Sequence, residues 1–157
     1  MMSGLTSDTS SITLLYSSRS LLRWCSSKFL ERSGVRCCPM KPEFTKSQTA
    51  TRKGLDNTPG EEHLANAKEL FENVVQKVRD NFGVTVINSG YRGPALNEAV
   101  GGSNKSQHCK GEAVDIECPG TGNYDVAKWI SENCDFDQLI LEFYTPGIPD
   151  SGWVHVS

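Results

Sequence analysis

Apolar residues recur at helical spacing in the middle of the chain, and this pattern predicts one long amphipathic helix. Thr58 is predicted to be its N-cap, with Pro59 at the first helical position and Glu61 closing a capping box. The helix is expected to run through about Arg79, because residues 81–83 break the pattern. One face of the helix would be buried, formed by Leu64, Ala67, Leu70, Phe71, Val74, Val75 and Val78.

Shorter segments alternate in hydrophobicity or are rich in β-branched residues, which is typical of strands. Strands are predicted at residues 84–88, 113–116, 139–143 and 153–156. A short helix is expected at residues 95–100, and a further helix at residues 123–133 with Asn123 as its cap. Helices and antiparallel strands in this order predict an α+β fold, in which a small antiparallel sheet is packed with helices.

The change in composition at Met40 divides the chain into two regions. Residues 1–39 are rich in Ser and Arg, as an organellar transit peptide would be. We favour a disordered tail or an over-extended gene start, with Met40 as the true initiator of a single domain at residues 40–157. The apolar run at residues 12–16 is too short for a secretory signal, and no segment is long enough to span a bilayer.

Bulk composition narrows the class of function. Hydrophobic residues make up 37% of the chain, charged residues 22%, and the formal charge is -3, which is typical of a soluble globular protein. No basic face is visible after residue 54, so nucleic acid is not expected as a partner. The six cysteines are expected to be mostly reduced, and the lack of a CxxC pair argues against a cysteine zinc site.

The three histidines are the first candidates for chemistry. His63 lies off the apolar stripe and is interpreted as a surface residue. His108 precedes Asp115 by seven positions, and a tight turn at Gly111 would allow both to reach one metal, although spacing alone favours a polar loop and a solvent-facing Asp. Strand alternation points His155 away from the two valines that flank it, toward a cleft or toward an ordinary strand environment.

Three blocks of residues together carry a family resemblance. They are Ser89-Gly90-Tyr91-Arg92, Ser106-x-His108-x-x-Gly111-x-Ala113-x-Asp115, and Trp153-Val154-His155-Val156-Ser157. In this order and spacing they resemble the zinc D-Ala-D-Ala carboxypeptidases, a family that includes phage endolysin peptidases and shares its fold with the hedgehog signalling domain. The similarity runs from about Phe44 to Ser157, and residues 44–45 and 49–51 are similar to the phage-type members.

The resemblance implies a zinc cleft with three metal ligands, His108, Asp115 and His155. It also implies that Arg92 faces the substrate and binds its carboxylate or the oxyanion that develops at the scissile carbonyl. Ser106 would support the loop that presents His108, with its hydroxyl directed to Asp115 or to the substrate. Trp153 would line the cleft.

One departure from the family pattern concerns the general base. Several relatives place a catalytic Glu three residues before the last zinc histidine, where this chain has Gly152. We therefore expect the base to be Glu142, at the end of a strand that pairs with the Trp153 strand, as in the hedgehog-type members. Asp150 is the alternative, and Glu112 and Glu117 are interpreted as surface acids.

The resulting hypothesis is zinc-dependent hydrolysis of D-amino-acid-containing peptides of bacterial peptidoglycan by a monomer. A phage lysis enzyme, made in the host cytoplasm and acting on the wall, is favoured over a bacterial remodelling carboxypeptidase. A zinc-containing binding module for peptidoglycan or a protein stays open, as does a structural domain without metal. Relatives usually continue beyond the position of Ser157, so a truncated gene or a dispensable last strand is expected, with fraying that could weaken the hold of His155 on metal.

Overall fold

The computed structural model describes residues 40–157. The predictions made for residues 1–39, including those for Cys25, Cys37 and Cys38, lie outside the described residues. Cys109, Cys118 and Cys134 are free thiols. Within the described part, no helix has the length and apolar character needed to cross a membrane.

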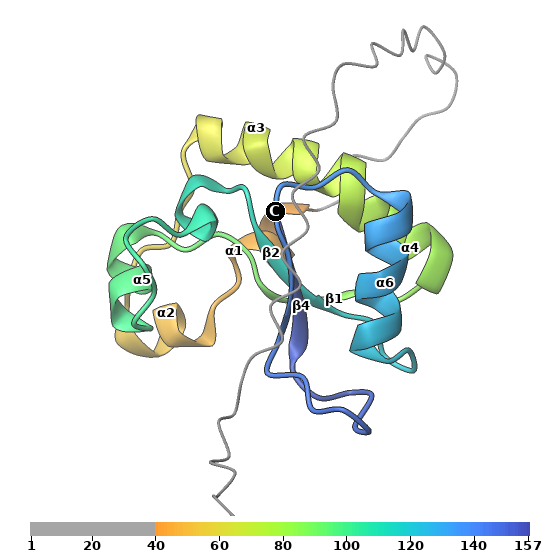
Figure 1. Ribbon diagram of the computed structural model, residues 1–157. Helices are drawn as coiled ribbons and strands as arrows, with labels where there is room; N and C mark the ends of the chain where they lie inside the picture. The colour runs from red at the N-terminus through yellow and green to blue at the C-terminus, as the bar shows by residue number, and fades with distance from the viewer. Residues whose placement is uncertain (1–39) are drawn as a thin grey trace, which may run out of the picture.

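A four-stranded antiparallel sheet forms the centre of the molecule (Figure 1), with strand order β1-β2-β4-β3. Its strands are β1 (Val86–Ser89), β2 (Val114–Glu117), β3 (Leu139–Glu142) and β4 (Trp153–Val156). The predicted α+β class with a small antiparallel sheet is confirmed. Strand alternation explains the two faces of the sheet, because Val154 and Val156 are fully buried in the core while His155 between them faces the other way.

Helices cover both sides of this sheet (Figure 1). On the core side lie α3 (Glu61–Leu70), the π-helical turn η1 (Phe71–Val75), α4 (Gln76–Phe82) and α6 (Asn123–Asn133). Helix α1 (Met40–Thr45) also contributes to the core, because its Phe44 is fully buried against Phe71. The short elements α2 (Gln48–Lys53), α5 (Pro94–Ala99) and η2 (Gln107–Lys110) frame the opposite side. The predicted apolar stripe is buried except for Leu64, which is half-buried.

Two predicted helix starts are wrong. Helix α3 begins at Glu61 with Gly60 as its N-cap, and the backbone N–H of Gly60 donates to Nδ1 of His63 over 3.2 Å. Thr58 does not cap the helix, because its hydroxyl and its N–H both donate to the carboxylate of Asp56, at 2.6 and 3.0 Å. His63 is consequently half-buried rather than a plain surface residue.

The second correction is at Asn123, which is the first residue of α6, with Gly122 as N-cap. The Asn123 side-chain amide instead donates to the carbonyl oxygens of Ser151 and Gly152, at 3.2 and 3.0 Å. This residue therefore holds the loop that leads into β4, three residues before His155. Strand β1 also differs from the prediction: it begins at Val86, two residues later than expected, and Val84 before it is 73% exposed.

Candidate metal centre

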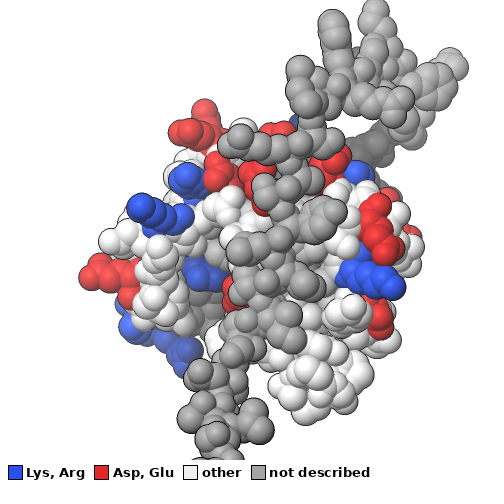
Figure 2. Space-filling view, viewed as in Figure 1, with Lys and Arg blue, Asp and Glu red and all other residues white. Residues whose placement is uncertain are grey.

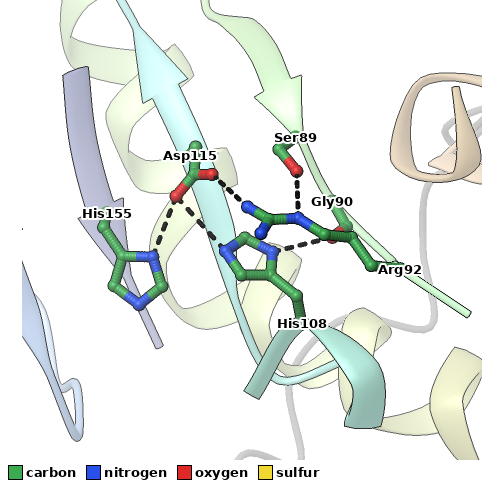
Figure 3. Close-up of polar contacts among 6 residues, drawn as sticks. All are labelled: Ser89, Gly90, Arg92, His108, Asp115 and His155. Atoms are coloured by element: carbon green, nitrogen blue, oxygen red, sulfur yellow. Dashed lines mark hydrogen bonds and ion pairs between the residues drawn. The ribbon is translucent and has the colours of Figure 1, made fainter. Parts of the chain in front are cut away.

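The structure brings His108, Asp115 and His155 together (Figure 3). One possible ligand atom from each lies within 4.8 Å of the others, and all three residues are buried. Asp115 of β2 pairs directly with His155 of β4, so the register of two adjacent strands sets both side chains on the same face. His108 comes from the 3₁₀ turn η2, which folds over that face.

Backbone contacts fix the orientation of the His108 ring. Its Nδ1 lies 2.7 Å from the carbonyl oxygen of Gly90 (Figure 3). A carbonyl can only accept, so Nδ1 carries a proton, and in the neutral ring Nε2 is the nitrogen with the lone pair. That Nε2 faces Oδ1 of Asp115 at 3.3 Å.

Asp115 is the hub of the cluster. Its Oδ1 faces both imidazoles, with His155 Nδ1 at 2.8 Å, while its Oδ2 accepts a hydrogen bond from Arg92 Nη2 at 2.9 Å. Burial alone would raise the pKa of this carboxyl, but hydrogen bonds and positive charge from His108 and His155 in their protonated forms outweigh it and hold the pKa well below its ordinary value. The group is therefore a carboxylate at neutral pH, the form that binds a metal.

The segment Ser89–Arg92 supports this hub through several contacts. Ser89 Oγ accepts a hydrogen bond from Arg92 Nε at 2.8 Å, which aims the guanidinium at Asp115. Gly90 packs so closely on the backbone of Phe44 that a Cβ would collide with the Phe44 carbonyl oxygen, and Tyr91 N donates to that oxygen at 2.8 Å. The glycine is thus required by a close approach of two backbones.

The tight turn predicted at Gly111 is present between η2 and β2. Gly111 has φ +77°, and a Cβ there would meet the backbone of His63. His63 itself does not join the metal group: its ring lies 5.0 Å from that of Tyr91, centroid to centroid. Its backbone packs against the turn that connects His108 to Asp115.

The metal group opens onto a cavity of about 310 Å³ whose lining includes Arg92, Ser106, His108, Glu142 and His155. Because Glu142 pairs with Trp153 and strand faces alternate, Glu142 lies on the same face of the sheet as His155. The Ser106 hydroxyl makes no hydrogen bond to Asp115 within residues 40–157, and Ser106 contributes backbone bonds that shape η2.

Trp153 and Asp150 lie away from this cavity. Trp153 lines a neighbouring cavity and stacks near Phe143, with ring centroids 5.0 Å apart. Asp150 is exposed in the β3–β4 loop and lines neither cavity.

A family model for peptidase M15 matches residues 40–157. The chain belongs to the peptidase M15 family. This family is zinc-dependent, so membership supports a zinc metallopeptidase that acts on a peptide substrate. No curated protein matches the chain.

The donor set fits the zinc of an M15 peptidase. Two imidazoles and one carboxylate form a common catalytic zinc site, which leaves a further position open. Ligands about 2.0–2.1 Å from a tetrahedral zinc lie about 3.3 Å apart, and His108 Nε2 stands 3.3 Å from Asp115 Oδ1. The bonds from Gly90 and Arg92 are the supporting contacts that such ligands usually have.

Sequence reasoning missed two of these supports. The Gly90 carbonyl that orients His108 and the Ser89 hydroxyl that orients Arg92 depend on tertiary contacts. Their signal was the Ser-Gly-Tyr-Arg string itself, where a glycine precedes a bulky aromatic residue and a charge. Arg92 was predicted to face substrate, and its bond to Asp115 adds a second contact to that prediction.

Proposed function

We propose that the protein is a zinc metallopeptidase that hydrolyses D-amino-acid-containing peptides of bacterial peptidoglycan, as a D-Ala-D-Ala carboxypeptidase or an endolysin-type endopeptidase. His108, Asp115 and His155 would hold the zinc. The observation that supports the proposal best is the shared cavity, which places Glu142 and Arg92 beside the two histidines of the metal group. A base and a cation next to a zinc site are the groups that peptide hydrolysis requires.

Zinc supplies Lewis-acid chemistry, polarising a carbonyl and making water a stronger nucleophile at neutral pH. Glu142 would accept the proton of the attacking water and return it to the leaving amine. Arg92 uses Nε and Nη2 for Ser89 and Asp115, and its Nη1 has no hydrogen-bond partner within residues 40–157. That nitrogen would bind the substrate carboxylate or the negative charge that develops on the scissile carbonyl.

The choice of Glu142 over Asp150 is supported by the cavity beside the metal group, because Glu142 lines it and Asp150 does not. The backbone around Gly152 accounts for the absence of a glutamate at that position. Gly152 has φ +68°, and a Cβ at this position would collide with the Glu142 carbonyl oxygen. A glutamate could not occupy position 152 without a change in the loop, so the missing Glu-x-x-His residue is explained by local geometry. The cavity still contains a carboxylate, that of Glu142.

We further propose a phage lysis enzyme, synthesised in a host cytoplasm, acting on the wall as a monomer. The resemblance of residues 44–45 and 49–51 to phage-type members supports this context over a bacterial remodelling carboxypeptidase. Ser106 and Trp153 would contact the substrate from the two neighbouring cavities.

The test is digestion of purified peptidoglycan by the full chain with added zinc, and in parallel with a chelator. Zinc-dependent release of D-alanine would establish a carboxypeptidase, and release of peptide fragments an endopeptidase, with product masses naming the bond. One bound zinc per chain without any release would reject hydrolysis and favour the zinc-containing binding module.

A further inference from the structure

A second cavity, of about 750 Å³, adjoins the metal group on the side of the edge strand β1. All four residues of β1 line it, together with the segment that joins α1 to α2, and it reaches Arg92, Asp115 and Trp153. Its volume falls within the range of about 300–1,000 Å³ typical of ligand sites. Because Arg92 lines both cavities, an extended peptide bound across the metal group could occupy both.

The charge of this cavity differs in sign from that of the whole chain, whose net charge is -3. Its cationic lining residues besides Arg92 are Lys46 and Arg52, and neither forms an ion pair with any residue in the region 40–157. Among residues 40–157 the one acidic lining residue is Asp115, whose carboxylate is already bound by Arg92. Figure 2 shows Lys and Arg side chains gathered where α2 lies in Figure 1.

The segment that carries Lys46 is held against the segment that carries Arg92, and through it beside the metal site. The side chain of Asn57 donates to the carbonyl oxygens of Thr45 and Tyr91, at 2.9 and 3.0 Å, and accepts from the backbone N–H of Gly93 at 2.7 Å. One half-buried amide therefore holds the backbone next to Lys46 against the backbone on either side of Arg92. The position of the Lys46 backbone is thus linked to that of the metal group.

The rest of the cavity has a mixed lining, with polar side chains from α2 and β1 beside apolar ones. Leu96 and Trp153 line it, as do Val86 and Val100, which are 41% and 47% exposed. Apolar side chains beside placed polar and charged groups give the two kinds of contact that a ligand with an aliphatic part and a charged end requires.

We propose that this cavity is a substrate subsite for a carboxylate-bearing residue, bound by Lys46 and Arg52 through its carboxylate and by the valines through its aliphatic part. The proposal rests on the proposed peptidase function and specifies its substrate: peptides with a free carboxylate beside the scissile bond, in preference to the corresponding carboxamides. Lys46 and Arg52 would be specificity residues with no part in the chemical step.

The test uses synthetic wall peptides in pairs that differ only by replacement of one carboxylate with a carboxamide. For the wild-type full chain we expect the carboxamide to raise KM about fivefold at one position, because each exposed ion pair is individually weak. In the Lys46→Gln/Arg52→Gln double variant, KM for the carboxylate peptide should rise to that of the carboxamide, with kcat within about twofold. Equal KM values for both members of every pair in the wild type, or preserved discrimination in the double variant, would overturn the proposal.

Lys53→Gln is the matched control. Lys53→Gln removes one positive charge from α2, as Arg52→Gln does, but Lys53 does not line the cavity, and its ammonium lies 3.5 Å from the Ala99 carbonyl oxygen. This variant should keep the wild-type discrimination. A loss of discrimination equal to that of the double variant would show a general field effect instead of a subsite.

Failure of the peptidase proposal can be separated from failure of the subsite. If the zinc-loaded wild type hydrolyses none of the peptides, binding of the same pairs is measured by titration calorimetry or NMR shifts. A carboxylate preference that the double variant loses would retain the subsite and reject hydrolysis. No preference in binding would reject the subsite.

Discussion

The close approach of Gly90 to Phe44 gives the sharpest test of how the metal centre is built. Substituting Gly90→Ala adds a Cβ that would collide with the carbonyl oxygen of Phe44 and lie 2.6 Å from its ring. The two backbones must separate, which weakens the Tyr91 N to Phe44 O hydrogen bond of 2.8 Å. The same shift moves the Gly90 carbonyl away from His108 Nδ1, now 2.7 Å distant.

Two quantities should change together in this variant. Overpacking costs about 1–3 kcal/mol and a lost hydrogen bond about 1 kcal/mol, so the free energy of unfolding should fall by about 2–4 kcal/mol. Loss of the contact that orients a metal-binding histidine typically weakens metal affinity by about 10–100-fold. Denaturant unfolding without metal measures the first, and zinc titration against a competing chelator measures the second.

Gly93→Ala is the control for this substitution. Gly93 lies in the same segment, has φ -56°, and a Cβ there would come no nearer than 3.4 Å to other atoms. Its cost should stay below about 1 kcal/mol, with unchanged zinc affinity. Wild-type stability and zinc affinity in Gly90→Ala would refute the account of His108 given above.

Three further outcomes are expected. Glu142→Gln should retain one zinc per chain while kcat falls by about 10²–10⁴-fold, whereas Asp150→Asn should keep the wild-type rate. Metal analysis measures the bound zinc and kinetics on wall peptides measure the rate. The reverse pattern of rates would make Asp150 the base. Arg92→Lys keeps the charge, but a lysine cannot make the two hydrogen bonds that the guanidinium makes to Ser89 and Asp115. Zinc affinity should therefore fall about 10–100-fold. An unchanged zinc affinity in a titration against a competing chelator would contradict this. Removal of zinc by a chelator should abolish activity. Zinc at about 100 times its Kd should raise the free energy of unfolding by about 2.7 kcal/mol. A melting temperature that does not change with zinc would argue against a site at His108, Asp115 and His155.

Local patterns were sufficient for most of the fold. The apolar stripe predicted the long helix because burial on one face depends only on helical spacing, and strand alternation separated His155 from the core valines for the same reason. The caps failed at Thr58 and Asn123 because each side chain found a partner outside the helix start. The π-helical turn at Phe71–Val75 and the short helices α1 and α2 had no local signal that we recognised.

The metal group was a different problem, because spacing left several interpretations open and only the family resemblance joined the three ligands. Their meeting depends on the register Asp115↔His155 between β2 and β4, which no pattern within one strand specifies. The same limit applies to Gly152, which in sequence looked like a lost catalytic residue. The fold shows that position 152 lies directly against the Glu142 carbonyl, where a Cβ would collide, while the pairing of Glu142 with Trp153 sets Glu142 on the face of His155. The glycine at position 152 is therefore required by a backbone contact, and the placement of the proposed base is set by the register of β3 and β4; both depend on the tertiary fold and not on a local pattern.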